Sequence, residues 1–280
     1  MAGHLISLTL RQHPDLFDVA DLARSKNALG PDHLLDLSNT AALQQLIEAE
    51  KPDLIINAAG ILNQSAEETP DEAILINSYL PHFLERITSG TNCRIIHIST
   101  DCVFSGEKGG YAEQDIKDGK GYYAQTKALG ELNNKKDLTI RTSIIGPELN
   151  VNGIGLFNWF ARAKGAIQGY TNAYWSGVTT TELANAIMYL IKENTTGLYH
   201  LVNNEKISKD FLLRLFLKYF PEGGVTEINA SGQYKVDKSL VNTRTDIRYK
   251  VPGYEDMIRD MKEWMTVNSG LYPQYASLLK

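Results

Sequence analysis

The sequence has little cysteine, no long apolar run and no excess of positive charge. Its two cysteines, Cys93 and Cys102, lie in no CxxC pair or Cys/His array, which argues against a disulfide scaffold or a metal site and favours a reducing compartment. No apolar run has the length of a membrane span, and no secretion signal opens the chain, so we expect a cytoplasmic protein. A net charge of −5 gives no reason to bind nucleic acid or an anionic membrane.

The first half alternates short apolar runs with segments of helical periodicity. The runs "HLLDL", "DLIINAAG", "CRIIHIST" and "LTIRTSIIG" read as strands. Between them, residues 39–52, 69–90 and 122–134 read as helices, with Thr69 as the N-cap of the second and Pro81 as a kink inside it. This alternation predicts an α/β fold with a doubly wound parallel sheet, which binds ligands at the carboxyl ends of its strands.

The composition changes after Pro147, where glycine, asparagine and aromatic residues become dense. Residues 179–193 read as a helix with a capping box from Thr179 to Glu182, "GLYHLV" as a strand, and two further amphipathic helices follow. No low-complexity linker separates the two parts. We therefore expect a smaller C-terminal lobe that is interwoven with the first part.

The strongest chemical signal is "YYAQTK", in which Tyr123 and Lys127 stand four residues apart. On a helix they share one face, and an ammonium beside a phenol would lower the pKa of the phenol. Taken alone, this spacing also fits an ordinary helix surface. Hydroxyl groups at Ser99 and Thr100 end the strand upstream and could hold a substrate carbonyl, although Thr100 could equally cap a turn.

Together these segments resemble the extended short-chain dehydrogenases/reductases, in the branch that contains dTDP-4-dehydrorhamnose reductase and related sugar-nucleotide reductases. The resemblance rests on "LIINAAG", Asn77 in "LINSYLP", "STDCVFSGEKGGYAEQD", "YYAQTKALGE", "IRTSIIGP" and "GVTTTELANAI". It implies a Rossmann-type dinucleotide-binding domain over residues 1–147 and a mainly substrate-binding lobe over residues 148–280.

The resemblance implies that Tyr123 protonates a ketone oxygen while a nicotinamide cofactor delivers hydride, that Lys127 holds the nicotinamide ribose and that Thr100 binds the same oxygen. Further cofactor-binding residues would be Gly3, Arg24, Ser25, Asp36, Leu37, Asn57, Ala58, Ala59, Gly60, Asn77 and Ser99. Further substrate-binding residues would be Cys102, Val103, Phe104, Trp159, Trp175, Lys238, Asn242 and Arg244. Either tryptophan could instead belong to the core, and Arg244 could instead form an ion pair.

The cofactor choice rests on the segment "FDVADLARSK". Arg24 and Ser25 could bind a 2′-phosphate, which favours NADPH, whereas the nearby Asp21 leaves NADH open. The branch leads us to expect an aromatic residue where Cys102 and Ile144 stand. These departures lie beside the expected sugar site, so a keto-deoxysugar nucleotide other than the rhamnose precursor is also open. We expect no metal, and the resemblance leaves room for a homodimer.

The resemblance also places a strand and a GxxGxxG turn before the first helix, and Gly3 in "MAGHLISLTL" fits the third glycine of that turn. We therefore expect the first strand and two glycines to lie upstream of the given sequence; a naturally trimmed relative is the alternative. Two other functions stay open: an NAD-dependent sugar-nucleotide epimerase or dehydratase, and a non-catalytic regulatory subunit with the same fold.

Overall fold

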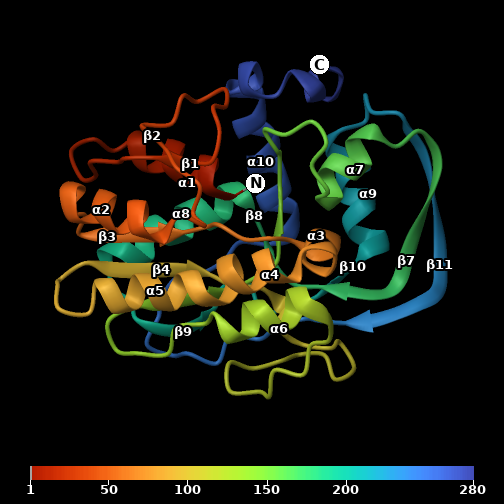
Figure 1. Cartoon of the computed structure of the whole chain (residues 1–280). Helices are drawn as coiled ribbons and strands as arrows, with labels where there is room; N and C mark the ends of the chain where they lie inside the picture. The colour runs from red at the N-terminus through yellow and green to blue at the C-terminus, as the bar shows by residue number, and fades with distance from the viewer. Residues whose placement is uncertain (1) are drawn as a thin grey trace.

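The centre of the molecule is a four-stranded parallel sheet in the order β3-β4-β5-β9, shown in Figure 1 by a computed structural model that describes residues 2–280. Its strands are Leu54–Asn57 (β3), Arg94–Ile98 (β4), Leu138–Arg141 (β5) and Gly197–His200 (β9). The register pairs Ile56 with Ile96 and Ile98 with Ile140. The expected parallel sheet is confirmed, and its carboxyl ends all lie at one edge.

Helices cover both faces of this sheet. Successive side chains of a strand point to opposite faces, so the apolar strands make both faces apolar and each face packs against helices. Ile95 packs in one apolar cluster with Leu43 and Leu84, whereas Ile96 packs in another with Leu138 and Leu183. Helices α2 and α5 cover the first face, and α1, α8 and α10 cover the second. Their bounds are Ala2–Arg11 (α1), Thr40–Glu50 (α2), Leu80–Ile87 (α5), Thr180–Lys192 (α8) and Tyr254–Val267 (α10).

The segment expected as one kinked helix contains three helical types in succession: Pro70–Ala73 (α4), the π-helix Ile74–Tyr79 (η1) and α5. Thr69 does not cap it, since its hydroxyl donates instead to the carbonyl of Ser65. The π-helical turn ends just before Pro81, which lacks the N–H that a regular helix would require there. The helical segment therefore continues past Pro81 because its hydrogen-bonding pattern changes from α to π and back to α.

A second sheet, in the order β10-β7-β11, forms one side of the molecule with α9 packed on it (Figure 1). Its elements are Gly165–Trp175 (β7), Ile207–Ser208 (β10), Lys209–Tyr219 (α9) and Val225–Asp237 (β11). Strands β7 and β11 were not anticipated from the sequence. Likewise, the strand expected from "LTIRTSIIG" is divided: β5 stays in the central sheet, while Ile144–Ile145 (β6) pairs with Val178–Thr179 (β8).

The remaining short elements connect these layers. They are Asn63–Glu68 (α3), Asp101–Val103 (η2), Gly121–Leu129 (α6), Leu156–Arg162 (α7), Ser269–Leu271 (η3) and Pro273–Leu279 (η4). No helix within residues 2–280 combines the length and the apolar character needed to cross a bilayer.

Beside the central sheet, the short strands Leu22–Ala23 (β1) and His33–Leu34 (β2) pair in parallel with each other. Within residues 2–280, no ladder joins β1 to β3. A cavity of about 1300 Å³ lies at this place, bordered by Ile6 of α1, by β1 and by the length of β3. The strand and two glycines that the resemblance puts ahead of Gly3 lie outside the described residues.

Candidate active site

Helix α6 carries Tyr123 and Lys127 on one face, as their spacing predicts. Its N-terminus is held by Glu67 of α3, whose carboxylate accepts from the backbone N–H of Tyr122 at 2.7 Å. Its C-terminal end packs closely on η1, where a methyl group at Gly130 would come within 1.9 Å of the carbonyl oxygen of Asn77. The helix is thus fixed at both ends, and the two reactive side chains have defined positions.

Thr100 follows β4 and has two roles in the structure. Its hydroxyl accepts from the backbone N–H of Cys102 at 3.1 Å, which caps the 3₁₀ turn η2, and donates to Oδ1 of Asp101 at 3.1 Å. It also lies beside the phenol of Tyr123, where it acts to lower the pKa of that phenol. The Thr100 side chain therefore caps η2 and at the same time lies next to Tyr123.

The expectation that Lys127 lowers the pKa of Tyr123 is wrong for the chain as it stands. Burial, with a smaller effect of Cys102, raises the pKa of Tyr123 well above its ordinary value of 10.0. The Lys127 amino group points elsewhere: Nζ donates to the carbonyl oxygen of Ile98 at 2.7 Å and lies 3.4 Å from Nε2 of His97. Tyr123 is a protonated phenol at neutral pH, as an unperturbed tyrosine also is, and its burial makes it a weaker acid than a free phenol.

Lys127 itself is 4% exposed. Burial lowers its pKa from 10.5 to about 8, against the opposing effect of the Glu131 carboxylate. A buried amine whose pKa lies near the working pH is typical of functional sites, although structural networks can produce the same shift.

Two lysines face the turn that follows Thr100. The buried carboxyl of Asp101 has a raised pKa because of burial, and the positive charges of Lys238 and Lys209 oppose that shift. Burial and the neighbouring Asp101 raise the pKa of the Cys102 thiol to about 11, so Cys102 is an uncharged thiol. Of the two lysines, only Lys238 was anticipated; Lys209 opens α9 and carried no sequence signal beyond its charge.

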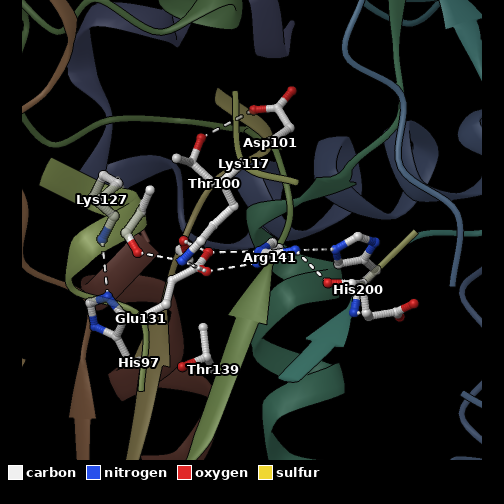
Figure 2. A network of polar contacts seen from close by, with 12 residues as sticks. His97, Thr100, Asp101, Lys117, Lys127, Glu131, Thr139, Arg141 and His200 are labelled. Carbon is white, nitrogen blue, oxygen red and sulfur yellow. Dashed lines mark hydrogen bonds and ion pairs between the residues drawn. The ribbon is translucent and has the colours of Figure 1, made fainter. Parts of the chain in front are cut away.

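A buried ion pair stands behind this turn (Figure 2). Arg141 of β5 donates from Nε and Nη2 to the two oxygens of Glu131, each at 2.7 Å, and both side chains are at most 5% exposed. Ser99 donates to the same carboxylate at 2.7 Å, and Nη1 of Arg141 lies 3.2 Å from Nε2 of His200. Ser99 is therefore committed to this network, which ties β4, β5, β9 and the end of α6 together.

Several of the predicted cofactor-binding residues line the 1300 Å³ cavity that extends along β3. These are Gly3, Ser25, Leu37, Asn57, Ala58 and Ala59. Arg24 is exposed after β1 and acts on the carboxylate of Asp36. Asn77 is buried and exchanges hydrogen bonds with the backbone of Ile61, at 2.9 Å each way, which fixes the loop after Gly60. Asp21 is the acidic residue that kept NADH possible as the cofactor, and its carboxylate accepts hydrogen bonds from Arg11 and Ser7.

The predicted substrate-binding residues are only partly brought together. Val103 and Phe104 are fully buried, and Phe104 stacks on Tyr111 at 4.2 Å between ring centroids. Trp175 is 3% exposed and packs against Tyr254, so all three predictions are corrected: these residues form core. Val103 and Phe104 pack in an apolar cluster with Tyr111 and Leu240, and for Trp175 the alternative of a core position is the one that the structure shows.

Two further predicted substrate residues are engaged in loop structure. Arg244 pairs with Asp246 at 2.5 Å and donates to the carbonyl of Thr196, and the side-chain oxygen of Asn242 accepts from the backbone N–H of Arg244 at 2.9 Å. The ion-pair interpretation of Arg244 is therefore the one that the structure bears out. Trp159 is 42% exposed on α7 and remains open to a ligand.

His97 is the site residue that sequence reasoning missed. It lies in the apolar strand "RIIHI", is fully buried and contacts both Lys127 and Asn57. A single histidine among isoleucines was the available signal. Within residues 2–280, no cluster of three or more His, Cys, Asp or Glu side chains has an arrangement that would hold a metal ion.

Comparison with known proteins identifies the family. The model of the RmlD substrate binding domain matches residues 16–231. The spore coat polysaccharide biosynthesis protein SpsK of Bacillus subtilis (strain 168) is 28% identical over 178 residues, which are 61% of this chain and 62% of that protein. A dTDP-4-dehydrorhamnose reductase of Aggregatibacter actinomycetemcomitans is 26% identical over 195 residues, 65% of this chain and 66% of the relative. The alignments thus span somewhat less than two thirds of these relatives.

Solved structures agree on the fold. A hypothetical dTDP-4-dehydrorhamnose reductase from Sulfolobus tokodaii has a TM-score of 0.74 and 25% identity, covering 91% of this chain and 96% of that one. A dTDP-4-dehydrorhamnose reductase from Bacillus anthracis in complex with NADP has a TM-score of 0.78 and 21% identity, covering 93% and 94%. The chain belongs to the RmlD substrate binding domain family, in the RmlD-like branch of the extended short-chain dehydrogenases/reductases.

Proposed function

We propose that this chain is an NADPH-dependent reductase of a keto-deoxysugar nucleotide, similar to dTDP-4-dehydrorhamnose reductase and acting in nucleotide-sugar and surface-polysaccharide biosynthesis. One observation carries the proposal: Tyr123 and Lys127 share a face of α6, and the Thr100 hydroxyl lies beside the Tyr123 phenol at the carboxyl end of β4. The names of the curated relatives, which include a polysaccharide biosynthesis protein and reductases of dTDP-sugars, support the substrate class.

In this proposal Tyr123 is the general acid. Its phenol is protonated at neutral pH, as an unperturbed tyrosine is, so it holds the proton that the ketone oxygen takes up as that oxygen gains negative charge. Thr100 donates a hydrogen bond to the same oxygen and positions it near the phenol. Lys127 binds the ribose hydroxyls of the cofactor. The nicotinamide cofactor, when bound, supplies the hydride.

The residues present fit such a cofactor. The cavity beside β3 reaches the carboxyl end of that strand, where the small side chains of Ala58 and Ala59 leave room for a ligand. The first turn of α1 contains no acidic residue that would repel a pyrophosphate. Gly3, Leu37 and Asn57 would line the dinucleotide, and the exposed Arg24 with Ser25 would favour a 2′-phosphate and hence NADPH.

The substrate would lie against Cys102 and Lys238, and an exposed tryptophan, Trp159, could support a base or sugar ring. We propose that residues 1–147 hold the dinucleotide and residues 148–280 mainly hold the sugar nucleotide. The two thiols, Cys93 and Cys102, are both free, which supports a cytoplasmic location.

The test is turnover of dTDP-4-dehydrorhamnose, followed by loss of NADPH absorbance, in wild type and two phenylalanine variants. Tyr123→Phe removes the proton donor and should lower kcat by at least about 100-fold. Tyr122→Phe is the matched control, because Tyr122 is the exposed neighbour on the same helix and should keep wild-type turnover.

Equal turnover in wild type and Tyr123→Phe would refute the assignment of the acid. Purified protein that retains NAD tightly and converts a sugar nucleotide without net oxidation of NADPH would replace the reductase with an epimerase or dehydratase. Failure to bind NADPH or NADH would refute the reductase and favour a regulatory subunit.

A further inference from the structure

His97 is a fully buried histidine in the middle of β4, and its two ring nitrogens face different side chains. Nδ1 lies 3.2 Å from Nδ2 of Asn57, and Nε2 lies 3.4 Å from Nζ of Lys127 (Figure 2 shows the second contact). Burial is the largest cause that holds the pKa of His97 well below its ordinary value. The ring is therefore neutral, with a proton on one nitrogen and a lone pair on the other.

The Asn57 amide decides which nitrogen carries the proton. Its oxygen accepts from the backbone N–H of Ala59 at 3.2 Å, so its amino group must be the end that faces His97. An amide amino group can only donate, so Nδ1 must present its lone pair. Rotating the amide by half a turn would place two donors opposite each other at Ala59 and would break the hydrogen bond that the Ala59 N–H now makes. Nε2 therefore carries the proton.

We propose that Nε2–H of His97 donates to Nζ of Lys127 and that this hydrogen bond stabilises the neutral amine of Lys127 relative to the ammonium in the ligand-free protein. A neutral amine has the lone pair that this hydrogen bond needs, and one of its own N–H groups still donates to the carbonyl of Ile98 at 2.7 Å. An ammonium group has three donors and no acceptor, so it would oppose Nε2–H directly. His97 is thus a positioning residue that sets the protonation of Lys127 through a chain that begins at the backbone of Ala59.

The charges around this pair agree with the geometry. Burial lowers the pKa of Lys127 to about 8, and the carboxylate of Glu131, which follows the C-terminal end of α6, opposes the shift. His97 is acted on by Lys127 and by His82 of α5, both of which disfavour a charged ring. Asn57 on β3 carries no charge. Of these, only Glu131 favours an ammonium at Lys127, and burial outweighs it.

The consequence for binding rests on the proposed function. Ribose hydroxyl oxygens placed at Nζ would accept from an ammonium, so cofactor binding favours the protonated form of Lys127. Above pH about 8, where the ligand-free amine is mostly neutral, binding must then take up one proton. The affinity for NADPH is expected to fall about tenfold for each pH unit above that value.

The first test requires no ligand. In protein labelled with ¹⁵N-histidine, long-range ¹H–¹⁵N correlation distinguishes the two neutral tautomers, and His97→Gln assigns the signal. We expect His97 to be protonated at Nε2 alone. Asn57→Asp should invert the tautomer, since a carboxylate can only accept and would draw the proton to Nδ1. Protonation of wild-type His97 at Nδ1, or at both nitrogens, would overturn the inference.

The second test measures NADPH affinity against pH by fluorescence titration in wild type, His97→Gln and His82→Gln. A glutamine oxygen at position 97 can accept from the Lys127 ammonium, so the pH at which affinity begins to fall should rise by about one unit. His82→Gln, a change at a side chain that is half exposed, should keep the wild-type profile. An unchanged profile in His97→Gln would overturn the inference. Absence of NADPH binding at every pH would refute the proposed function, whereas the tautomer measurement would still decide the role of His97.

Discussion

Glu182 provides a prediction about stability that can be worked from its surroundings. It lies in the first turn of α8, is 6% exposed, and one carboxyl oxygen accepts from the hydroxyl of Tyr249 at 2.7 Å. Burial raises the pKa of Glu182 from 4.5 to about 7. The folded chain therefore holds a proton on Glu182 between pH about 4.5 and about 7, where the unfolded chain has lost it.

The sign of the pH dependence follows from this difference. Because the folded state binds more protons in that interval, stability contributed by Glu182 is complete below pH about 4.5 and is lost as pH rises through about 7. At 1.36 kcal/mol for each pH unit, the full loss is about 3 kcal/mol. A loss of this size is a substantial part of the free energy of unfolding of an ordinary protein.

The perturbation is Glu182→Gln, which keeps an oxygen for Tyr249 and removes the ionisable group. Urea unfolding should give nearly equal stability for variant and wild type at pH about 4.5, and a variant more stable by about 3 kcal/mol at pH about 8. Glu263→Gln, at an exposed position of α10, should show no such pH-dependent difference. A Glu182→Gln effect of the same size at both pH values would refute the reasoning.

Two other substitutions test how the site is held. Glu131→Gln should lower the free energy of unfolding by about 3–5 kcal/mol in urea, because it leaves the Arg141 charge buried and unpaired. Adding Arg141→Met should recover most of this loss. If the double variant recovers nothing, the ion pair does not account for the loss. Gly130→Ala should cost about 3 kcal/mol, since its methyl group would meet the carbonyl oxygen of Asn77 at 1.9 Å, whereas Gly270→Ala, with open space around it, should be nearly neutral.

Local sequence was sufficient to predict those features of the structure that depend only on residues close together in the chain. Helix α8 begins where its cap predicts, since the Thr179 hydroxyl accepts from the backbone N–H of Glu182. The shared face of Tyr123 and Lys127 follows from helix geometry alone. The capping box is completed only in part, however, because the Glu182 side chain turns to Tyr249, which lies 67 residues away.

Features that depend on distant partners were not readable. Strands β7 and β11 pair residues about 60 positions apart, with two register irregularities, and their sequence mixes glycine, polar and aromatic residues without strict alternation. The role of Trp175 depended on whether the second lobe would cover it, and Tyr254 on α10 does so. Periodicity describes one element at a time and contains no information on which element packs against it.

The sequence by itself determined the alternation of strands and helices in the first half, the parallel sheet and the shared face of Tyr123 and Lys127 on α6, because hydrophobic periodicity and helical spacing are properties of nearby residues. Only the tertiary structure decided the chemical state of that pair. Burial raises the pKa of Tyr123. Nζ of Lys127 on α6 contacts His97 and the carbonyl oxygen of Ile98, both on β4, instead of the phenol of Tyr123. Desolvation and hydrogen-bond partners arise when distant segments come together, and they set the protonation on which the proposed chemistry depends.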